Sequence, residues 1–262
     1  MMRALNTAGT GMISQQSNLD TIANNLANVN TTSFKQQRAQ FQDLVYQTFR
    51  ASGASGGGTA SAPQAAQIGL GSRFASSSTS FNQGPMMSSG DPMHMAINGD
   101  GFFQVTLPDG TLAYTRDGSF ATDSAGQVVT SDGYLLEPGI VIPTGARAIS
   151  ISQTGVVSAV LPGSDEPTEI GTIQIAVFPN PAGLTRMGQN LYLAGGGSGS
   201  PTPSNPGDTG AGLINQFFLE GSNVQVVEEM VSMIIAQRAY EINSKAIQTA
   251  DDMLGILNNL KR

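Results

Sequence analysis

The fold is decided by the C-terminal stretch SNVQVVEEMVSMIIAQRAYEINSKAIQTADDMLGILNNLKR, residues 222–262. Apolar residues recur in it every three or four positions, and this heptad spacing places them along one side of an α-helix. Ser222 with Gln225 three residues later forms a capping box, which starts a helix. The stretch therefore predicts one long helix over residues 223–260. Its apolar seam consists of Val231, Ile235, Ala239, Ile242, Ala246, Met253, Ile256 and Leu260.

A second amphipathic pattern lies at the other end of the chain. Apolar residues at heptad spacing, with only Gln15 polar among them, predict a helix over residues 2–29. The polar side of this helix carries Asn, Gln and Ser in place of Lys and Glu. Because such side chains cost less than charges to remove from water, this side can be buried against other chains. The apolar seam consists of Leu5, Met12, Leu19, Ile22, Leu26 and Val29.

We expect the two terminal helices to pair as a coiled-coil-like hairpin. Small residues in the C-terminal helix permit close approach of its partner, namely Ala236, Ala239, Ala246 and Ala250. A pair of amphipathic helices still offers its outer faces to other molecules. Pairing within the chain and assembly between chains are therefore compatible.

The middle of the chain is punctuated by turns. Between residues 98 and 133 stand five Asx-Gly dipeptides, which suit the positive backbone angles of tight hairpin turns. They separate short apolar runs at 102–107, 112–116 and 127–130, and further strands are expected at 74–80, 148–151, 155–160 and 170–178. The middle is therefore predicted to be an all-β, antiparallel and hairpin-rich domain, which makes the whole chain α+β.

Charge divides the chain into parts. Only 12% of the residues are charged, and residues 51–72 and 187–207 carry no charge at all, as linkers or long loops do. The expected organisation is an N-terminal helix (1–35), an extended linker or hairpin (36–71), a β-rich domain (72–221) and a C-terminal helix (222–262).

Composition excludes much catalytic chemistry. With no cysteine and one histidine, the chain cannot form a thiolate zinc site, a cysteine nucleophile or a site with two imidazoles. Its glycine runs lack the Lys-Ser/Thr of a phosphate loop, and its aspartates lack the spacing of an EF-hand. His94 is expected to be structural. A net charge of −7 argues against a nucleic-acid partner. We expect no enzyme activity, no cofactor, no metal and no small-molecule substrate.

The chain resembles the bacterial flagellar rod and hook proteins in several motifs that follow the family order. They are Ala23 to Lys35, Asn98 to Phe103, Tyr114 to Phe120, and the tail from Ser222 through Glu241. Ser33 departs from the family pattern, which usually has glycine there, and Ser tolerates a positive backbone angle poorly. The signature residues carried over are Ala23, Asn24, Asn25, Ala27, Asn28, Thr31, Phe34, Lys35, Gln237, Arg238, Ala239 and Tyr240.

The resemblance implies a self-assembling structural subunit. Within the family, the length and the added segment 36–71 are most similar to distal rod proteins, whose extra segment keeps the rod straight and stiff. Subunits would stack helically into a hollow shaft, with the terminal helices as the inner tube and the β domain outside. The shaft would cross the periplasm, carry torque to the hook and let export substrates pass.

The resemblance also implies partners. They are further copies of the chain, proximal rod proteins, the hook and hook-junction side, the P and L ring proteins, the rod-capping protein and the flagellar type III export apparatus. Family members are exported without a cleaved signal peptide, and the N-terminus lacks the pattern of one.

Three alternatives stay open at the level of sequence. A hook or proximal rod subunit of the same family would differ in filament curvature, and the uncharged segment 51–72 favours the distal rod. A secreted all-β carbohydrate-binding protein would need a pocket rimmed by aromatic residues, whereas the chain has no Trp and 6% aromatic residues. An adhesin would not need heptads at both ends.

Overall fold

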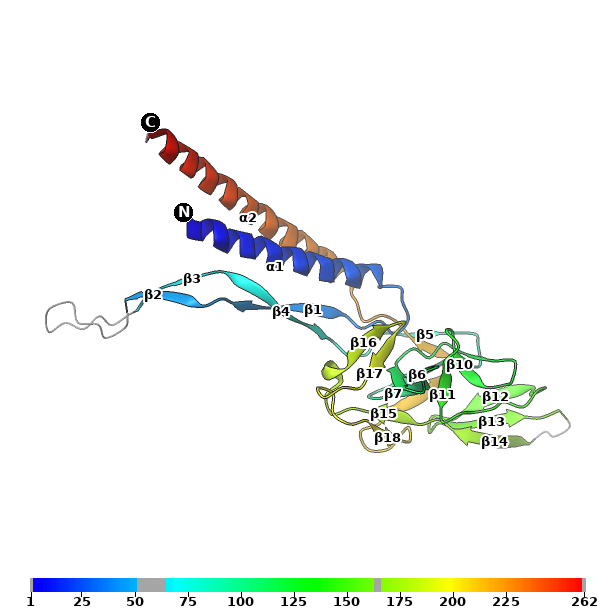
Figure 1. The fold of residues 1–262 in the computed structure, drawn as a ribbon. Helices are drawn as coiled ribbons and strands as arrows, with labels where there is room; N and C mark the ends of the chain where they lie inside the picture. Colours follow the sequence, from blue (N-terminus) through cyan, green and yellow to red (C-terminus); the bar gives the residue numbers. More distant parts are fainter. Residues whose placement is uncertain (1, 51–64, 163–165, 261–262) are drawn as a thin grey trace. The chain divides into compact units, whose positions relative to one another are not determined.

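A computed structural model describes residues 2–50, 65–162 and 166–260, and Figure 1 shows its elements. The uncharged stretch 51–64 lies outside the described residues. The chain forms two compact units. The helical unit comprises Met1–Ala27, Gln37–Thr79 and Gln225–Arg262, and the β unit comprises Asn28–Gln36 and Ser80–Val224. The domain boundaries expected from sequence stay a prediction, although residues 28–35, expected with the N-terminal helix, group with the β unit by their contacts.

The helical unit contains both predicted helices. Helix α1 spans Met2–Ala27 and helix α2 spans Val226–Leu260, and the two pack along each other (Figure 1). The predicted cap at Ser222 is wrong, because α2 begins at Val226 and the Ser222 hydroxyl instead accepts the amide of Val224 at 3.3 Å. The prediction of two paired terminal helices is confirmed.

A β ribbon completes the helical unit on the far side of α1. Strand β1 (Gln37–Asp43) pairs antiparallel with β4 (Ser72–Thr79), and β2 (Tyr46–Arg50) pairs with β3 (Ala66–Gly69). Helix α1 contacts both β1 and β4 as well as α2. The Ser14 and Ser72 hydroxyls lie 3.1 Å apart where α1 meets β4. Strands β1 to β4 are called the hairpin arm below, and they include most of the described part of the extended segment expected at residues 36–71.

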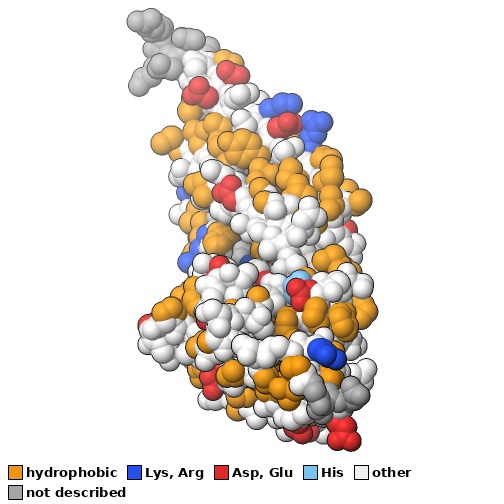
Figure 2. Space-filling model, turned by 90° about the vertical axis from the view of Figure 1, so that its right-hand side faces the viewer, with side chains coloured by type: hydrophobic (Ala, Val, Ile, Leu, Met, Phe, Trp, Pro, Cys, Tyr) orange, Lys and Arg blue, Asp and Glu red, His pale blue; other side chains and the backbone are white. Residues whose placement is uncertain are grey.

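The side of α2 that packs on α1 is not the predicted apolar seam. Ala236 and Ala250 on the packing side are 1% and 4% exposed, as expected for small residues that allow close approach. Seam residues Ile235 and Ile242 are instead 63% and 66% exposed. Large hydrophobic side chains reach the surface on the face shown in Figure 2. The apolar seam of α2 is therefore left without a partner inside the chain for the described residues.

The β unit is antiparallel, as predicted. Its largest sheet has the order β16-β17-β8-β7-β11-β10-β9, with β15 pairing β7 and β18. A second sheet has the order β12-β13-β14, and β6 pairs β19 while β5 pairs β20. The strands are β5 (Met86–Ser88), β6 (Met95–Asn98), β7 (Phe102–Thr106), β8 (Leu112–Thr115), β9 (Phe120–Thr122), β10 (Val128–Thr130), β11 (Leu135–Glu137), β12 (Ala148–Ile151), β13 (Val156–Val160), β14 (Pro167–Thr172), β15 (Ile175–Val177), β16 (Thr185–Gly188), β17 (Leu191–Leu193), β18 (Thr202–Ser204), β19 (Leu213–Gln216) and β20 (Phe218–Glu220).

The Asx-Gly dipeptides have more than one role. Those at 109–110 and 132–133 close the β7–β8 and β10–β11 hairpins, as predicted. Gly118 does not have a positive φ, unlike the other four glycines. A Cβ at position 118 would lie 1.5 Å from the Met95 carbonyl oxygen. Glycine is therefore required here because the backbones of Gly118 and Met95 approach closely, and not because a turn needs a positive φ.

Apolar side chains from both sheets fill one main core, which includes Met95, Ile97, Phe103, Leu136 and Ile175.

None of the helices, over the residues that the structure describes, combines the length and apolar character needed to cross a bilayer.

Candidate functional site

Two segments far apart in sequence lie side by side in the β unit. One follows α1 and the other precedes α2. The Ser33 amide donates to the Glu220 carbonyl at 2.8 Å, and the Asn223 amide donates to the Phe34 carbonyl at 3.3 Å. The Asn223 side chain accepts from the Gln36 amide at 2.7 Å and donates to the Ser80 carbonyl at 2.9 Å. The chain segments that lead to both helices are thus bonded to each other and to the β unit.

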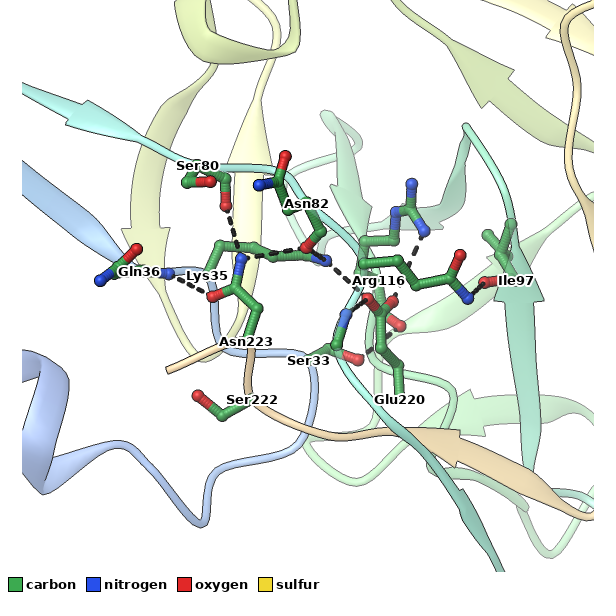
Figure 3. A network of polar contacts seen from close by, with 12 residues as sticks. Ser33, Lys35, Gln36, Ser80, Asn82, Ile97, Arg116, Glu220, Ser222 and Asn223 are labelled. Atoms are coloured by element: carbon green, nitrogen blue, oxygen red, sulfur yellow. Dashed lines mark hydrogen bonds and ion pairs between the residues drawn. The ribbon is translucent and has the colours of Figure 1, made fainter. Parts of the chain in front are cut away.

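A buried charge cluster lies at the centre of this junction (Figure 3). The Lys35 ammonium is 2.6 Å from one Glu220 carboxylate oxygen, and the Arg116 guanidinium is 3.5 Å from the other. The side chains of Lys35 and Glu220 are 0% exposed and that of Arg116 is 3% exposed. Lys35 comes from the segment after α1, Arg116 follows β8, and Glu220 ends β20. One carboxylate therefore joins three parts of the chain.

Further hydrogen bonds reduce the cost of burying these charges. Glu220 accepts from the Gly84 amide at 2.9 Å, Lys35 donates to the Asn82 carbonyl at 2.9 Å, and Arg116 donates to the Gly99 carbonyl at 2.8 Å. Burial nevertheless lowers the pKa of Lys35 below its ordinary value, because loss of water outweighs the attraction of Glu220. Burial likewise lowers the pKa of Arg116. Burying these charges is therefore unfavourable in free energy unless all three charged residues are present.

Ser33 adopts the backbone angle that the family glycine would favour. Its φ is 55°, in the left-handed region. The Ser33 hydroxyl donates to the Arg116 carbonyl at 2.7 Å, in addition to the amide bond with Glu220. The turn is therefore formed even though Ser33 stands where the family usually has glycine. The buried hydrogen bond of the Ser33 hydroxyl offsets the strain of the left-handed backbone angle.

Two substitutions at Ser33 separate strain from hydrogen bonding. Ser33→Ala removes the hydroxyl and keeps the strain, so we expect it to lower the free energy of unfolding by about 1–2 kcal/mol. Ser33→Gly removes the same bond but relieves the left-handed strain, and should be about 1 kcal/mol more stable than Ser33→Ala. Urea denaturation of the full chain measures both. An alanine variant as stable as the glycine variant would contradict this account.

The segment after α1 is also held from outside the charge cluster. The Arg186 guanidinium donates to the Lys35 carbonyl and lies over the Phe34 ring at 5.3 Å. The Asn190 side chain donates to the Thr32 carbonyl at 3.2 Å. Thr31 donates to the Asn28 side chain at 3.2 Å. Signature residues 28–35 therefore form a compact, anchored turn.

A second buried polar contact lies within the helical unit. The Asn25 side chain accepts from the Gln37 amide at 2.9 Å and donates to the Gln37 carbonyl at 2.8 Å. It also donates to Glu229 of α2 at 3.1 Å. Asn25 is 1% exposed, so its amide is committed to these partners. A buried polar contact of this kind favours one register between paired helices.

Most of the remaining predicted residues are exposed or partly exposed, Ile22 of α1 is buried, and the roles of all of them stay predictions. Along α2, Arg238 pairs with Glu241 at 2.9 Å in an exposed position. The apolar seam of α1 is at least half-buried. The exposed signature residues are Ala23, Asn24, Ala27, Gln237, Arg238 and Tyr240, and the exposed seam residues include Val231, Ile235, Ile242, Ala246, Met253 and Ile256.

Sequence reasoning did not single out Glu220, Arg116, Arg186 or Asn190 as site residues. Arg116 lies in the motif Tyr114 to Phe120 that carries the family resemblance, but the motif alone indicated no partner for it. Glu220 is the only charged residue between Asp208 and Glu228 in the sequence, and a charged residue that is fully buried is nearly always paired.

Comparison with known proteins gives matches along the chain. The flagella basal body rod protein family matches residues 5–35, the flagellar hook protein FlgE/F/G D1 domain matches residues 96–159, and the flagellar basal body rod FlgEFG protein C-terminal family matches residues 215–260. The first and last matches contain Lys35 and Glu220 respectively, and the middle match contains Arg116.

Whole-chain relatives agree with these matches. The flagellar basal-body rod protein FlgG of Borreliella burgdorferi is 53% identical, with 100% of both chains covered. FlgG of Caulobacter vibrioides is 45% identical over 99% of this chain and 100% of its own, and FlgG of Bacillus subtilis is 42% identical over 100% of both. The chain therefore belongs to the flagellar basal-body rod proteins, as a structural subunit of the distal-rod type located in the flagellar basal body.

Proposed function

We propose that copies of this chain assemble helically, through the apolar seam of α2, into a rigid hollow shaft that transmits motor torque to the hook. The exposed seam is the observation that carries this proposal. Large apolar side chains in a continuous line, such as Ile235 and Ile242, are covered in a stable assembly. Their burial between copies would supply the driving force.

The buried charge cluster gives the shaft a route for torque. The ion pairs of Glu220 with Lys35 and Arg116 hold the two segments that lead to the terminal helices against the strands of the β unit. Only a few residues separate α1 from Lys35 and Glu220 from α2. A twisting force on either terminal helix is therefore passed to the charge cluster through a short segment. The cluster resists it with hydrogen-bonded ion pairs that are shielded from water and salt.

The remaining partners follow from the same role. The proposal includes the proximal rod proteins, the hook and hook-junction side, the P and L ring proteins, the rod-capping protein and the type III export apparatus. It assigns the chain no catalytic activity, cofactor or metal. The whole-chain relatives at 42–53% identity, all named FlgG, support a distal rod.

The hairpin arm supplies the test that separates a distal rod from a hook. Exposed aromatic side chains line it, including Phe41, Tyr46, Phe49 and Phe74. We expect the concentrated full chain to form straight tubes in electron micrographs. A variant in which Asn-Gly replaces residues 45–70, leaving the Leu44 to Gly71 hydrogen bond at 2.8 Å as the end of the ribbon, should form curved or flexible tubes.

Full-chain protein that stays monomeric at every concentration would contradict the proposed assembly. Straight tubes from the shortened variant would contradict the stiffening role of the arm.

A further inference from the structure

Asn25 of α1 contacts two other elements of the helical unit through one buried side-chain amide. Its Oδ1 accepts from the Gln37 amide at 2.9 Å, and its Nδ2 donates to the Gln37 carbonyl at 2.8 Å. The same Nδ2 donates to a Glu229 carboxylate oxygen at 3.1 Å. A primary amide has two N–H donors, so both are used. The two bonds to β1 hold the amide in one orientation, and the remaining N–H is therefore directed at α2.

A second contact between the helices belongs to the same register. Helices α1 and α2 run in opposite directions (Figure 1). A Cβ on Gly11 would lie 2.9 Å from the side-chain nitrogen of Asn243, so these two positions face each other. Gly11 stands 14 residues before Asn25. Asn243 stands 14 residues after Glu229, as one antiparallel register requires.

The side of α2 that packs on α1 repeats every seven residues. It carries Glu229, Ala236, Asn243 and Ala250, of which the two alanines are 1% and 4% exposed. A shift by one heptad brings Ala236 to the place of Glu229. The same shift brings Ala250 to the place of Asn243. Because alanine is smaller than either residue that it replaces, shape at these two positions does not exclude the shift.

We propose that Asn25 sets the register of α2 on α1 through its hydrogen bond to Glu229. In the shifted register Asn25 faces Ala236, which has no side-chain acceptor, and one buried N–H loses its partner. A shift in the other direction would bring position 222 to this place, and that position lies before α2 begins. A buried polar residue selects one register of paired helices in this way, at some cost in stability. Asn25 is thus a positioning residue for α2 and, through Gln37, for the start of the hairpin arm.

The inference deepens the proposed function and rests on it for its consequence in the tube. Ile235 and Ile242 of the exposed seam lie on the helix whose register Asn25 sets. A shift by one heptad would displace this seam by about 10.5 Å relative to the hairpin arm. Copies in different registers would not repeat the same contacts, so a single register is a condition for a uniform tube.

A distance measurement in the dilute monomer tests the register directly. The chain has no cysteine, so Asp20→Cys and Asp251→Cys, both at exposed positions, take one spin label each. Pulsed electron paramagnetic resonance should give one distance for the labelled chain. In Asn25→Ala with Glu229→Ala, positions 229 and 236 both carry alanine. We expect a second, shorter distance there, because a heptad shift brings the labels about 10.5 Å closer along the helix axis. The ratio of shifted to unshifted chains should rise at least about tenfold.

Two controls separate selection of the register from a general loss of stability. Glu229→Gln keeps an acceptor oxygen for Asn25 and should give the single distance of the labelled chain. Ile22→Ala removes a buried apolar side chain of α1 without touching the polar contact, and should also give that single distance. A single distance in the double alanine variant, or a second distance in Glu229→Gln, would overturn the inference. A broad distribution from unpaired helices would also overturn it, because Asn25 would then be needed for pairing itself.

Electron microscopy tests the consequence for assembly. Tubes of the double alanine variant should be irregular in diameter, whereas those of Glu229→Gln should be uniform. Uniform tubes from the double alanine variant would contradict the role of the register in assembly. Failure of the unmodified chain to form tubes would refute the proposed function alone, because the distances in the monomer decide the inference independently.

Discussion

Ile242→Asp should abolish assembly into tubes and leave the β unit folded. Ile242 lies in the middle of the α2 seam and is 66% exposed, so the monomer loses little when it is replaced. In the proposed assembly the same position is buried among apolar side chains of other copies. An unpaired carboxylate there costs several kcal/mol per contact, and a helical array repeats that cost at every subunit.

The expected result is a rise of more than about a hundredfold in the concentration needed for assembly, corresponding to at least roughly 2.7 kcal/mol per subunit. Light scattering and electron microscopy measure it. Gln248→Asp is the matched control, because it introduces the same charge at an exposed position of α2 outside the seam. Normal tubes from Ile242→Asp, or equal loss in both variants, would show that the seam is not the contact.

Glu220→Ala should be the most destabilising single substitution in the β unit. Removing this carboxylate leaves Lys35 and Arg116 buried without their counter-charge, and the Gly84 amide loses its acceptor. Breaking a buried pair in this way costs about 3–5 kcal/mol. We therefore expect the urea midpoint of the full chain to fall sharply.

Two controls separate a buried cluster from an ordinary ion pair. Glu241→Ala removes the exposed pair with Arg238 and should change the free energy of unfolding by less than about 1 kcal/mol. In a double-mutant cycle, Lys35→Ala combined with Glu220→Ala should cost clearly less than the sum of the single changes, because the pair is coupled. Additive costs would mean that Lys35 and Glu220 act independently.

The sequence predicts which segments form helices and strands better than it predicts which side of a helix packs inside the chain. Heptad spacing identified both helices, and Asx-Gly dipeptides identified a hairpin-rich β domain, because both signals are local. The face that α2 turns to α1 is a tertiary choice. The pairing side uses small and polar residues such as Ala236, Ala250 and Glu229, and it leaves the stronger apolar seam at Ile235 and Ile242 outside. Periodicity alone favours the opposite arrangement.

The candidate site was predictable only in part, for a similar reason. The family motifs contain two members of the charge cluster, Lys35 and Arg116, but neither motif indicates that both residues pair with Glu220. Arg116 and Glu220 are 81 or more residues away from Lys35 in sequence, and the pairing depends on the register of β8 and β20. Ser33 shows the limit of reasoning from residue preference. Its left-handed angle was expected to be unfavourable, but a hydrogen bond to Arg116 that no local pattern reveals supports it.

The most direct test of the central claim is an electron cryo-microscopy reconstruction of tubes assembled from the full chain. We expect Val231, Ile235, Ile242 and Met253, all exposed in the single chain, to contact apolar side chains of neighbouring copies. We also expect the pairing of Glu220 with Lys35 to persist in each subunit. A reconstruction in which these seam residues still face solvent would contradict the account.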